Sequence, residues 1–217
     1  SKCGSGDVLE ALNIKIDLEP QDVEREINTN NFGFMFAPNF HSAMRFVGPI
    51  RKKIGKRTIF NMIGPLSNPS LVDRQVVGVF DKKLLKIFAE GLKNLNLKKA
   101  LILCSQDGLD EISPYAKTDI VELSNGNIKE FELNPNDLGI NANNFSDIVG
   151  RESEYNSAKI KEVFNGKDND FSVAICLNAA AGLIVSEKSE TFKDGYEKLR
   201  KHILSGSVMK HISKFIK

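Results

Sequence analysis

The stretch QVVGVFDKKLLKIFAEGLKNLNLKKALILC, residues 75–104, decides the fold. Residues 75–80 and 100–104 are short, nearly continuous apolar runs, a composition typical of strands that are buried on both faces. Between them, residues 82–95 have the apolar spacing of an amphipathic helix. A strand, a helix and a second buried strand together predict a parallel crossover unit, and therefore an α/β fold.

Further elements follow on either side of this unit. An Asn-Gly turn at 125–126 lies between the alternating segments 119–123 and 128–133, which is a strong signal for a β-hairpin. The segment 172–177 has the composition of a strand, whereas its continuation through Asn178-Ala-Ala-Ala-Gly182 favours a helix, so both remain open. Gly64-Pro65 is expected to end one helix. The expected helices are 6–12, 20–29, 41–55, 57–63, 153–165, 190–204 and 207–216.

Composition narrows the classes of function. The chain has 217 residues, 41% of them hydrophobic and 27% charged, as in ordinary globular proteins. No apolar run reaches the length of a membrane span, so we expect no membrane partner. The formal net charge of +2 gives little attraction for nucleic acid. Cys3, Cys104 and Cys176 are far apart and have no metal-ligand spacing, which favours a reducing cytoplasm.

Two neighbouring acids mark the end of the second buried strand. Asp110 and Glu111 lie in SQDGLDEIS, residues 105–113, directly after that strand. Ligands of such sheets bind beyond the carboxyl ends of the strands. Mg²⁺ prefers one or two carboxylates together with water and substrate phosphates. The pair therefore predicts a site for a metal and a diphosphate, and the alternative is an acidic surface turn.

Three other segments hold candidate binding residues. The small residues of SKCGSGDVLE, 1–10, could hold an anion at a helix start, or could be a flexible beginning. Arg51 could pair with a planar carboxylate, or could be a solvated helix charge. His41 could cap a helix or contact a ligand. RTIFNMIGPLSNP, 57–69, has a short helix between two breaks, which resembles a hinge or is an ordinary connection.

Taken in order, these motifs resemble the anthranilate phosphoribosyltransferase family. The resemblance rests on SKCGSGDVLEAL at 1–12, FMFAPNFH at 34–41, Arg51, RTIFNMIGPLSNP, QVVGV at 75–79, DGLDEIS at 107–113 and LNAAAGL at 177–183. It implies a central, mostly parallel sheet flanked by helices, of the nucleoside phosphorylase/phosphoribosyltransferase catalytic-domain type. By the resemblance, 1–33 and 70–217 form the α/β domain. Residues 34–69 return to a small helical domain and a hinge.

The resemblance also implies a reaction. Members of this family transfer phosphoribosyl from phosphoribosyl pyrophosphate (PRPP) to anthranilate, with Mg²⁺, in tryptophan biosynthesis. The products are N-(5'-phosphoribosyl)anthranilate and pyrophosphate. Matching positions imply that PRPP is bound by Ser1 and Ser5, anthranilate by Arg51, His41, Pro38 and Gly64, and Mg²⁺ by Asp110 and Glu111.

The chain departs from the family pattern in one respect that matters for activity. The Gly-Thr-Gly-Gly-Asp loop that grips the diphosphate is absent, as is most of the helical domain. We therefore expect the chain by itself to be inactive. The family forms homodimers through the helical domain, so we do not expect this chain to dimerise in that way.

Two other functions stay open at this point. A pyrimidine nucleoside phosphorylase has a similar opening motif, but RTIFNMIGPLSNP and DGLDEIS disfavour it. Relatives of the same architecture that bind nucleic acid are not enzymes. The basic residues within 51–57 favour such a relative. The low net charge and the Asp110-Glu111 pair oppose it, because acids near a groove repel phosphate, and we expect no nucleic-acid partner.

Overall fold

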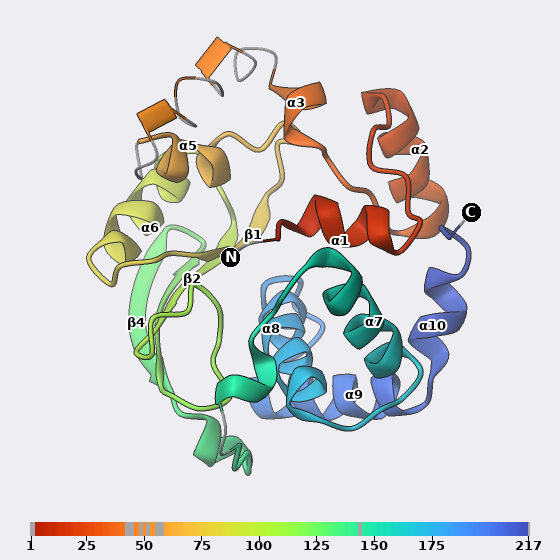
Figure 1. Ribbon diagram of the computed structural model, residues 1–217. Coiled ribbons are helices and arrows are strands. Elements are labelled where there is room, and N and C mark those ends of the chain that lie inside the picture. Colours follow the sequence, from red (N-terminus) through yellow and green to blue (C-terminus); the bar gives the residue numbers. More distant parts are fainter. Residues whose placement is uncertain are drawn as a thin grey trace. The chain divides into compact units, whose positions relative to one another are not determined.

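The computed structural model describes residues 3–41, 46–47, 50, 53–54, 59–142 and 145–216. For residues 60, 61 and 147 it describes the backbone alone. The described residues form two compact units. The first lies within 1–64, 150–158 and 210–217, and the second within 65–149 and 159–209 (Figure 1). The domain limits expected from the resemblance stay a prediction.

The second unit contains a four-stranded sheet in the order β1-β2-β3-β4. Its strands are β1 (Arg74–Gly78), β2 (Lys99–Ser105), β3 (Thr118–Ser124) and β4 (Asn127–Leu133). Helix α6 (Leu84–Asn94) joins β1 to its parallel neighbour β2, which confirms the crossover unit. Asn125 and Gly126 have φ values of 48° and 79° in the turn between β3 and β4, which confirms the hairpin.

The expectation of a mostly parallel sheet is wrong for the described strands. β2 pairs with β3, and β3 with β4, in antiparallel fashion, so only β1 and β2 are parallel. The reason is the connection after β2. Residues 106–117 form a loop without a helix, whereas a parallel neighbour is usually reached through a helical crossover. The loop instead turns the chain back along β2. The α/β class itself is confirmed.

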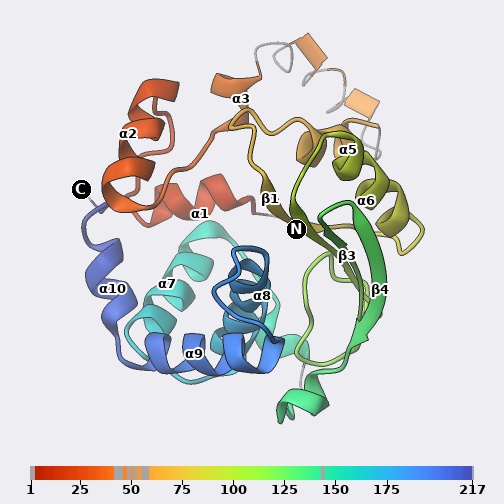
Figure 2. The same ribbon diagram turned by 180° about the vertical axis from the view of Figure 1, so that it is seen from behind.

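Both faces of β2 are covered. Leu101 and Leu103 belong to a core cluster with α8 (Asp170–Val185) and α9 (Phe192–Leu204), whereas α6 packs on β2 and β3. Helices α8 and α9 lie side by side in both views (Figure 2). Burial on both faces explains the continuous apolar sequence of β2, in which every residue after Lys99 is buried.

The ambiguous segment 172–177 is helical. It lies inside α8, whose seven buried residues lie along one wide face, while the other residues of the helix are half-buried and mostly apolar. An apolar helix without a polar face shows no helical period, which is why its composition also suited a strand. Asn169 begins α8 with a capping box, because its Oδ1 accepts the Ser172 N–H at 3.0 Å and Ser172 Oγ accepts the Asn169 N–H at 3.1 Å.

The first unit is built mainly of short helices. α1 (Ser5–Ala11), α2 (Pro20–Asn30) and α3 (Ala37–Phe40) lie in it. An isolated bridge joins Ile14 to Ile216, and the ring of Phe32 meets that of Phe215 edge-on at 5.2 Å. Most of the helix expected over 41–55 lies outside the described residues. The remaining elements are α5 (Phe60–Leu66), η1 (Pro135–Leu138), η2 (Phe145–Ile148), α7 (Ser153–Phe164) and α10 (Ser207–Ile212).

Helix α5 does not end at Gly64-Pro65 as expected. It continues through Pro65 to Leu66. Proline removes one backbone hydrogen bond, but its fixed φ is helical, so the helix can include Pro65 and the residue after it. The Pro65 carbonyl oxygen then accepts a hydrogen bond of 2.9 Å from Nε2 of Gln75.

The two outer strands of the sheet, β1 and β4, differ in the side chains that they expose. On and beside β1, Val76 and Phe80 are each 37% exposed. On β4, Lys129, Glu130 and Glu132 are exposed. In the described part of the chain, no helix has the length and apolar character needed to cross a bilayer.

Candidate active site in the loop after β2

The loop that follows β2 has a shape fixed by its own backbone. The N–H of Ser105 donates to the Leu109 carbonyl at 2.9 Å, and the N–H of Gly108 donates to the Ser105 carbonyl at 3.1 Å. Gly108 has φ +93°, a conformation that strains other residues. At the base of the loop, the Gln106 N–H donates to the Lys117 carbonyl at 2.9 Å. These bonds hold residues 107–116 beyond the end of β2.

A buried serine hydroxyl closes the loop. Ser113 Oγ donates to Oδ2 of Asp107 at 2.5 Å and accepts from the N–H groups of Tyr115 and Ala116 at 3.0 and 3.3 Å. Ser113 is fully buried. Asp107 is therefore occupied with holding the loop together. The two other acids of this motif, Asp110 and Glu111, are exposed as whole residues, although the carboxyl group of Glu111 is itself partly surrounded by protein.

The environment of this exposed pair favours a cation. Burial of its carboxyl group raises the pKa of Glu111 above its ordinary value, and the neighbouring Asp110 charge raises it further. Among the ion pairs of the described residues, none involves either acid. A bound cation would offset both effects, because its positive charge stabilises the ionised carboxylate.

Two contacts from neighbouring elements position the acidic pair. A Cβ placed on Gly78 of β1 would lie 1.6 Å from the Asp110 carbonyl oxygen, so the close approach requires glycine. On the other side, Asn178 of α8 makes two hydrogen bonds to the backbone of Ile112. Both residues belong to quoted motifs, QVVGV and LNAAAGL, but the spacing of those motifs gives no sign of this role.

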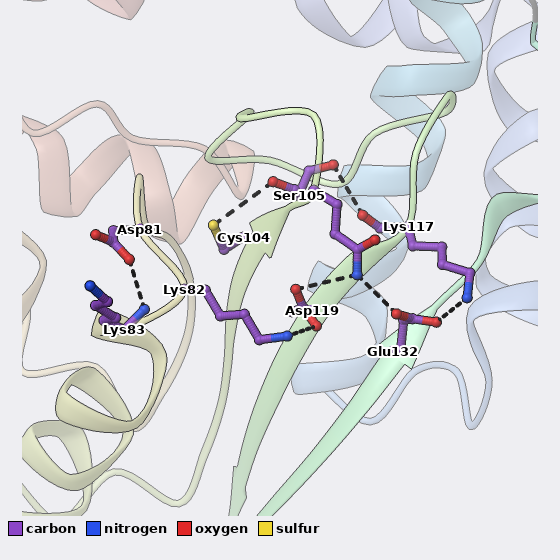
Figure 3. A network of polar contacts seen from close by, with 9 residues as sticks. Asp81, Lys82, Lys83, Cys104, Ser105, Lys117, Asp119 and Glu132 are labelled. Atoms are coloured by element: carbon purple, nitrogen blue, oxygen red, sulfur yellow. Dashed lines mark hydrogen bonds and ion pairs between the residues drawn. The ribbon is translucent and has the colours of Figure 1, made fainter.

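A network of charges lies at the same end of β2 (Figure 3). Nε2 of Gln106 donates to Glu132 at 2.9 Å and to Asp119 at 3.4 Å. Lys117 pairs with Glu132 at 2.6 Å and lowers the pKa of that carboxyl, with help from the Gln106 hydrogen bond. Lys82 pairs with Asp119 at 2.6 Å. These charges are used in fixing the strand ends.

The other predicted site residues lie in the first unit or outside the described residues. Ser5 begins α1, next to Gly4, whose N–H donates to Oδ2 of Asp7 at 2.7 Å. Pro38 is in the first turn of α3, and His41 ends that helix, donating its N–H to the Ala37 carbonyl at 2.9 Å. Gly64 lies within α5. Ser1 and Arg51 lie outside the described residues. All these binding roles stay predictions.

The acidic pair suits Mg²⁺ better than a metal that needs a full protein cage. Among the described residues, no group of three or more His, Cys, Asp or Glu side chains could hold a metal ion. Mg²⁺ keeps several waters and is commonly held by one or two carboxylates plus substrate phosphates. Asp110 and Glu111 would be the two hard oxygen ligands of such a site, and this role stays a prediction.

Comparison with known proteins now places the chain. The family model described as glycosyl transferase family, a/b domain, matches residues 1–209. The chain belongs to this family. Within the glycosyl transferase family it is 68% identical, over 206 residues, to an anthranilate phosphoribosyltransferase from Pelagibacter ubique, and the match covers 95% of this chain and 62% of the relative. A second relative with that name, from Desulfatibacillum aliphaticivorans, is 42% identical and is covered to 64%.

Solved structures of this family support the same family assignment. Anthranilate phosphoribosyltransferase from Thermus thermophilus superposes with a TM-score of 0.90 at 32% identity, covering 98% of this chain and 63% of that one. The enzyme from Saccharomyces cerevisiae in complex with PRPP and Mg gives 0.89 at 30% identity, covering 99% and 62%. The resemblance seen in the motifs is confirmed. The chain spans less than two thirds of the length of these relatives.

Proposed function

We propose that this chain is the part of an anthranilate phosphoribosyltransferase that carries the acidic pair for Mg²⁺. The observation that carries the proposal is the arrangement of Asp110 and Glu111, which are adjacent, exposed and anchored on both sides. The 68% identity to the Pelagibacter ubique relative supports the substrate assignment. A relative solved with PRPP and Mg supports the choice of metal. Function in the cytoplasm belongs to the same proposal.

The proposed reaction joins anthranilate to ribose. The anthranilate nitrogen bonds to C1 of the ribose while the bond from C1 to the diphosphate oxygen breaks, and the amine proton leaves to solvent. The leaving diphosphate takes the electron pair and carries several negative charges, so neutralising it is the main demand on the site. Mg²⁺, when bound, supplies that neutralisation. Asp110 and Glu111 would hold it.

The remaining residues act by binding and orientation. In the proposal, Ser1 and Ser5 bind PRPP, while Pro38, His41 and Gly64 line the anthranilate site. Arg51 pairs with the anthranilate carboxylate and aims the amine at C1. The aromatic amine is neutral at pH 7 and already nucleophilic, so positioning can supply several kcal/mol without a strong general base.

The test uses a full-length chimera, in which this chain is joined to the segment of the Pelagibacter ubique relative that it does not span. Asp110→Asn with Glu111→Gln should abolish the Mg²⁺-dependent formation of phosphoribosylanthranilate. Glu90→Gln with Glu197→Gln is the matched control, because it removes two exposed acids from α6 and α9 instead. Normal turnover in the first double variant would reject the metal role.

The same protein decides between the alternative functions. Phosphorolysis of thymidine or uridine, without anthranilate transfer, would favour a nucleoside phosphorylase. Salt-dependent DNA binding without PRPP binding would favour a nucleic-acid-binding relative.

A further inference from the structure

We infer that Asn178 is a positioning residue that holds the two metal-binding carboxylates of the β2–β3 loop in place. The inference rests on the proposed function, because it concerns how Asp110 and Glu111 are presented to Mg²⁺. In this inference Asn178 is not itself a metal ligand. It acts through the backbone of Ile112, the residue after Glu111.

The Asn178 amide binds both backbone polar groups of Ile112. Its Oδ1 accepts the Ile112 N–H at 2.8 Å, and its Nδ2 donates to the Ile112 carbonyl at 2.9 Å. Ile112 lies in a loop and is 1% exposed, so neither water nor a neighbouring strand is the natural partner for these groups. The side-chain amide makes the two hydrogen bonds that a neighbouring strand would make in a sheet. It reaches across a sequence separation of 66 residues.

A further hydrogen bond, within α8, fixes the orientation of the Asn178 amide. Nδ2 of Asn178 also donates to the carbonyl of Ala174, one turn earlier in α8, at 3.0 Å. Both Nδ2 hydrogens therefore meet carbonyl oxygens, and a flipped amide would place Oδ1 against those same oxygens. The supporting helix is firmly packed, since Leu177 beside Asn178 is fully buried in the core cluster.

A second anchor lies on the other side of Glu111. The backbone of Asp110 packs against Gly78 of β1. The residue before Glu111 is therefore held by the sheet, and the residue after it by α8. Because both neighbours are fixed, the directions in which the Asp110 and Glu111 side chains leave the backbone are fixed as well. Partners that orient metal ligands in this way commonly change metal affinity by about 10–100-fold when they are removed.

The test must separate positioning from general stability of α8. Asn178→Leu removes every polar contact of the side chain. Asn178→Ser is the gentler variant, because its hydroxyl can still bond the Ala174 carbonyl but is too short for Ile112. Asn169→Ala is the matched control: it removes the N-cap of the same helix, whose Oδ1 accepts the Ser172 N–H, and keeps the side chains of Asn178 and Asp170 that bond to the loop.

The readout is binding of Mn²⁺ in the presence of PRPP to the full-length chimera, followed by the electron paramagnetic resonance signal of free Mn²⁺. Amide hydrogen exchange of Ile112 is followed in parallel. We expect Asn178→Ser and Asn178→Leu to weaken Mn²⁺ binding about 10-fold or more and to speed the exchange of the Ile112 amide. Asn169→Ala should lower the unfolding midpoint but change Mn²⁺ binding less than twofold.

Two outcomes would overturn the inference, and they differ in what else they reject. Mn²⁺ binding in Asn178→Ser within twofold of the unaltered protein, with faster exchange at Ile112, rejects the positioning role alone. Equal Mn²⁺ binding in the unaltered protein and in Asp110→Asn with Glu111→Gln rejects the metal site itself, and with it both the proposed function and the role of Asn178.

Discussion

Gly78 of β1 and Asp110 of the loop after β2 meet backbone to backbone, with only 1.6 Å between the Asp110 carbonyl oxygen and the place a Cβ on residue 78 would take. No side chain fits there unless the loop moves. The position of Asp110 and Glu111 therefore depends on residue 78 having no side chain. A substitution at residue 78 tests this dependence.

Gly78→Ala should force the loop away from β1. We expect a loss of about 1–3 kcal/mol in the free energy of unfolding, measured by urea titration, together with weaker Mn²⁺ binding in the full-length chimera. Gly182→Ala in α8 is the matched control, because no atom lies within 4 Å of the added methyl group. It should raise stability by about 0.5–1 kcal/mol, since alanine is the better helix former. A neutral Gly78→Ala would show that the loop adapts freely.

Glu111 should make stability depend on pH. Its pKa is raised in the folded protein by burial and then by Asp110, so the folded state binds the proton more tightly than the unfolded chain does. Stability is therefore lost as pH rises from the ordinary value of 4.5 through the raised pKa. Glu111→Gln escapes this loss and should have the higher unfolding midpoint at pH 7, with the difference vanishing near pH 4.

Thermal denaturation between pH 4 and 7 measures this difference. Mg²⁺ with PRPP should raise the midpoint of the unaltered full-length chimera more than that of Glu111→Gln. If the unaltered protein were the more stable of the two at pH 7 without metal, the carboxylate would be stabilised by the fold, contrary to the direction of its pKa.

Arg200 and Asp168 form a two-pronged ion pair that joins α9 to the start of α8. Both Nη1–Oδ1 and Nη2–Oδ2 distances are 2.6 Å, and Asp168 raises the pKa of the guanidinium. Arg200→Lys keeps the charge but loses the planar fork. We expect it to cost about 1 kcal/mol of unfolding free energy, and Arg200→Gln somewhat more. Equal stability of Arg200→Lys and the unaltered protein would show that charge alone suffices.

Arg51→Ala in the full-length chimera should raise the KM for anthranilate far more than it changes PRPP binding. The reason is that a guanidinium pairs with the planar carboxylate of anthranilate through two hydrogen bonds. Steady-state kinetics with each substrate varied in turn separates the two effects. Lys53→Ala is the control for loss of a nearby charge. An unchanged anthranilate KM in Arg51→Ala would remove this residue from the site.

Local patterns predicted most elements, and the misses have physical causes. The β1–α6–β2 crossover and the β3–β4 hairpin were readable because helical spacing and an Asn-Gly turn act over neighbouring residues. The antiparallel return of β3 was not readable, because it depends on how residues 106–117 fold rather than on a strand pattern. α8 was ambiguous because its less buried face is apolar too, which removes the helical period from the sequence.

The residues of the candidate site also divide into those that the sequence indicates and those that only the structure reveals. Asp110 and Glu111 could be named as candidates because adjacent acids after a buried strand are visible in sequence. The parts played by Gly78 and Asn178 were missed, since each contact joins backbone to a residue distant in the chain. For Asn178 that distance is 66 positions. A glycine in a strand and an asparagine in a buried apolar helix were the two available signals, because each is out of place by composition alone.

The unequal outer strands of the sheet have a consequence for handling the protein. The exposed lysine and glutamate side chains of β4 would become buried if a strand of a second molecule paired with β4. Burying these charges is unfavourable, which discourages edge-to-edge pairing of two molecules. On β1 the corresponding positions include the half-exposed Val76, which offers no such deterrent. We therefore expect aggregation during purification to begin at β1, and Val76→Lys should suppress it.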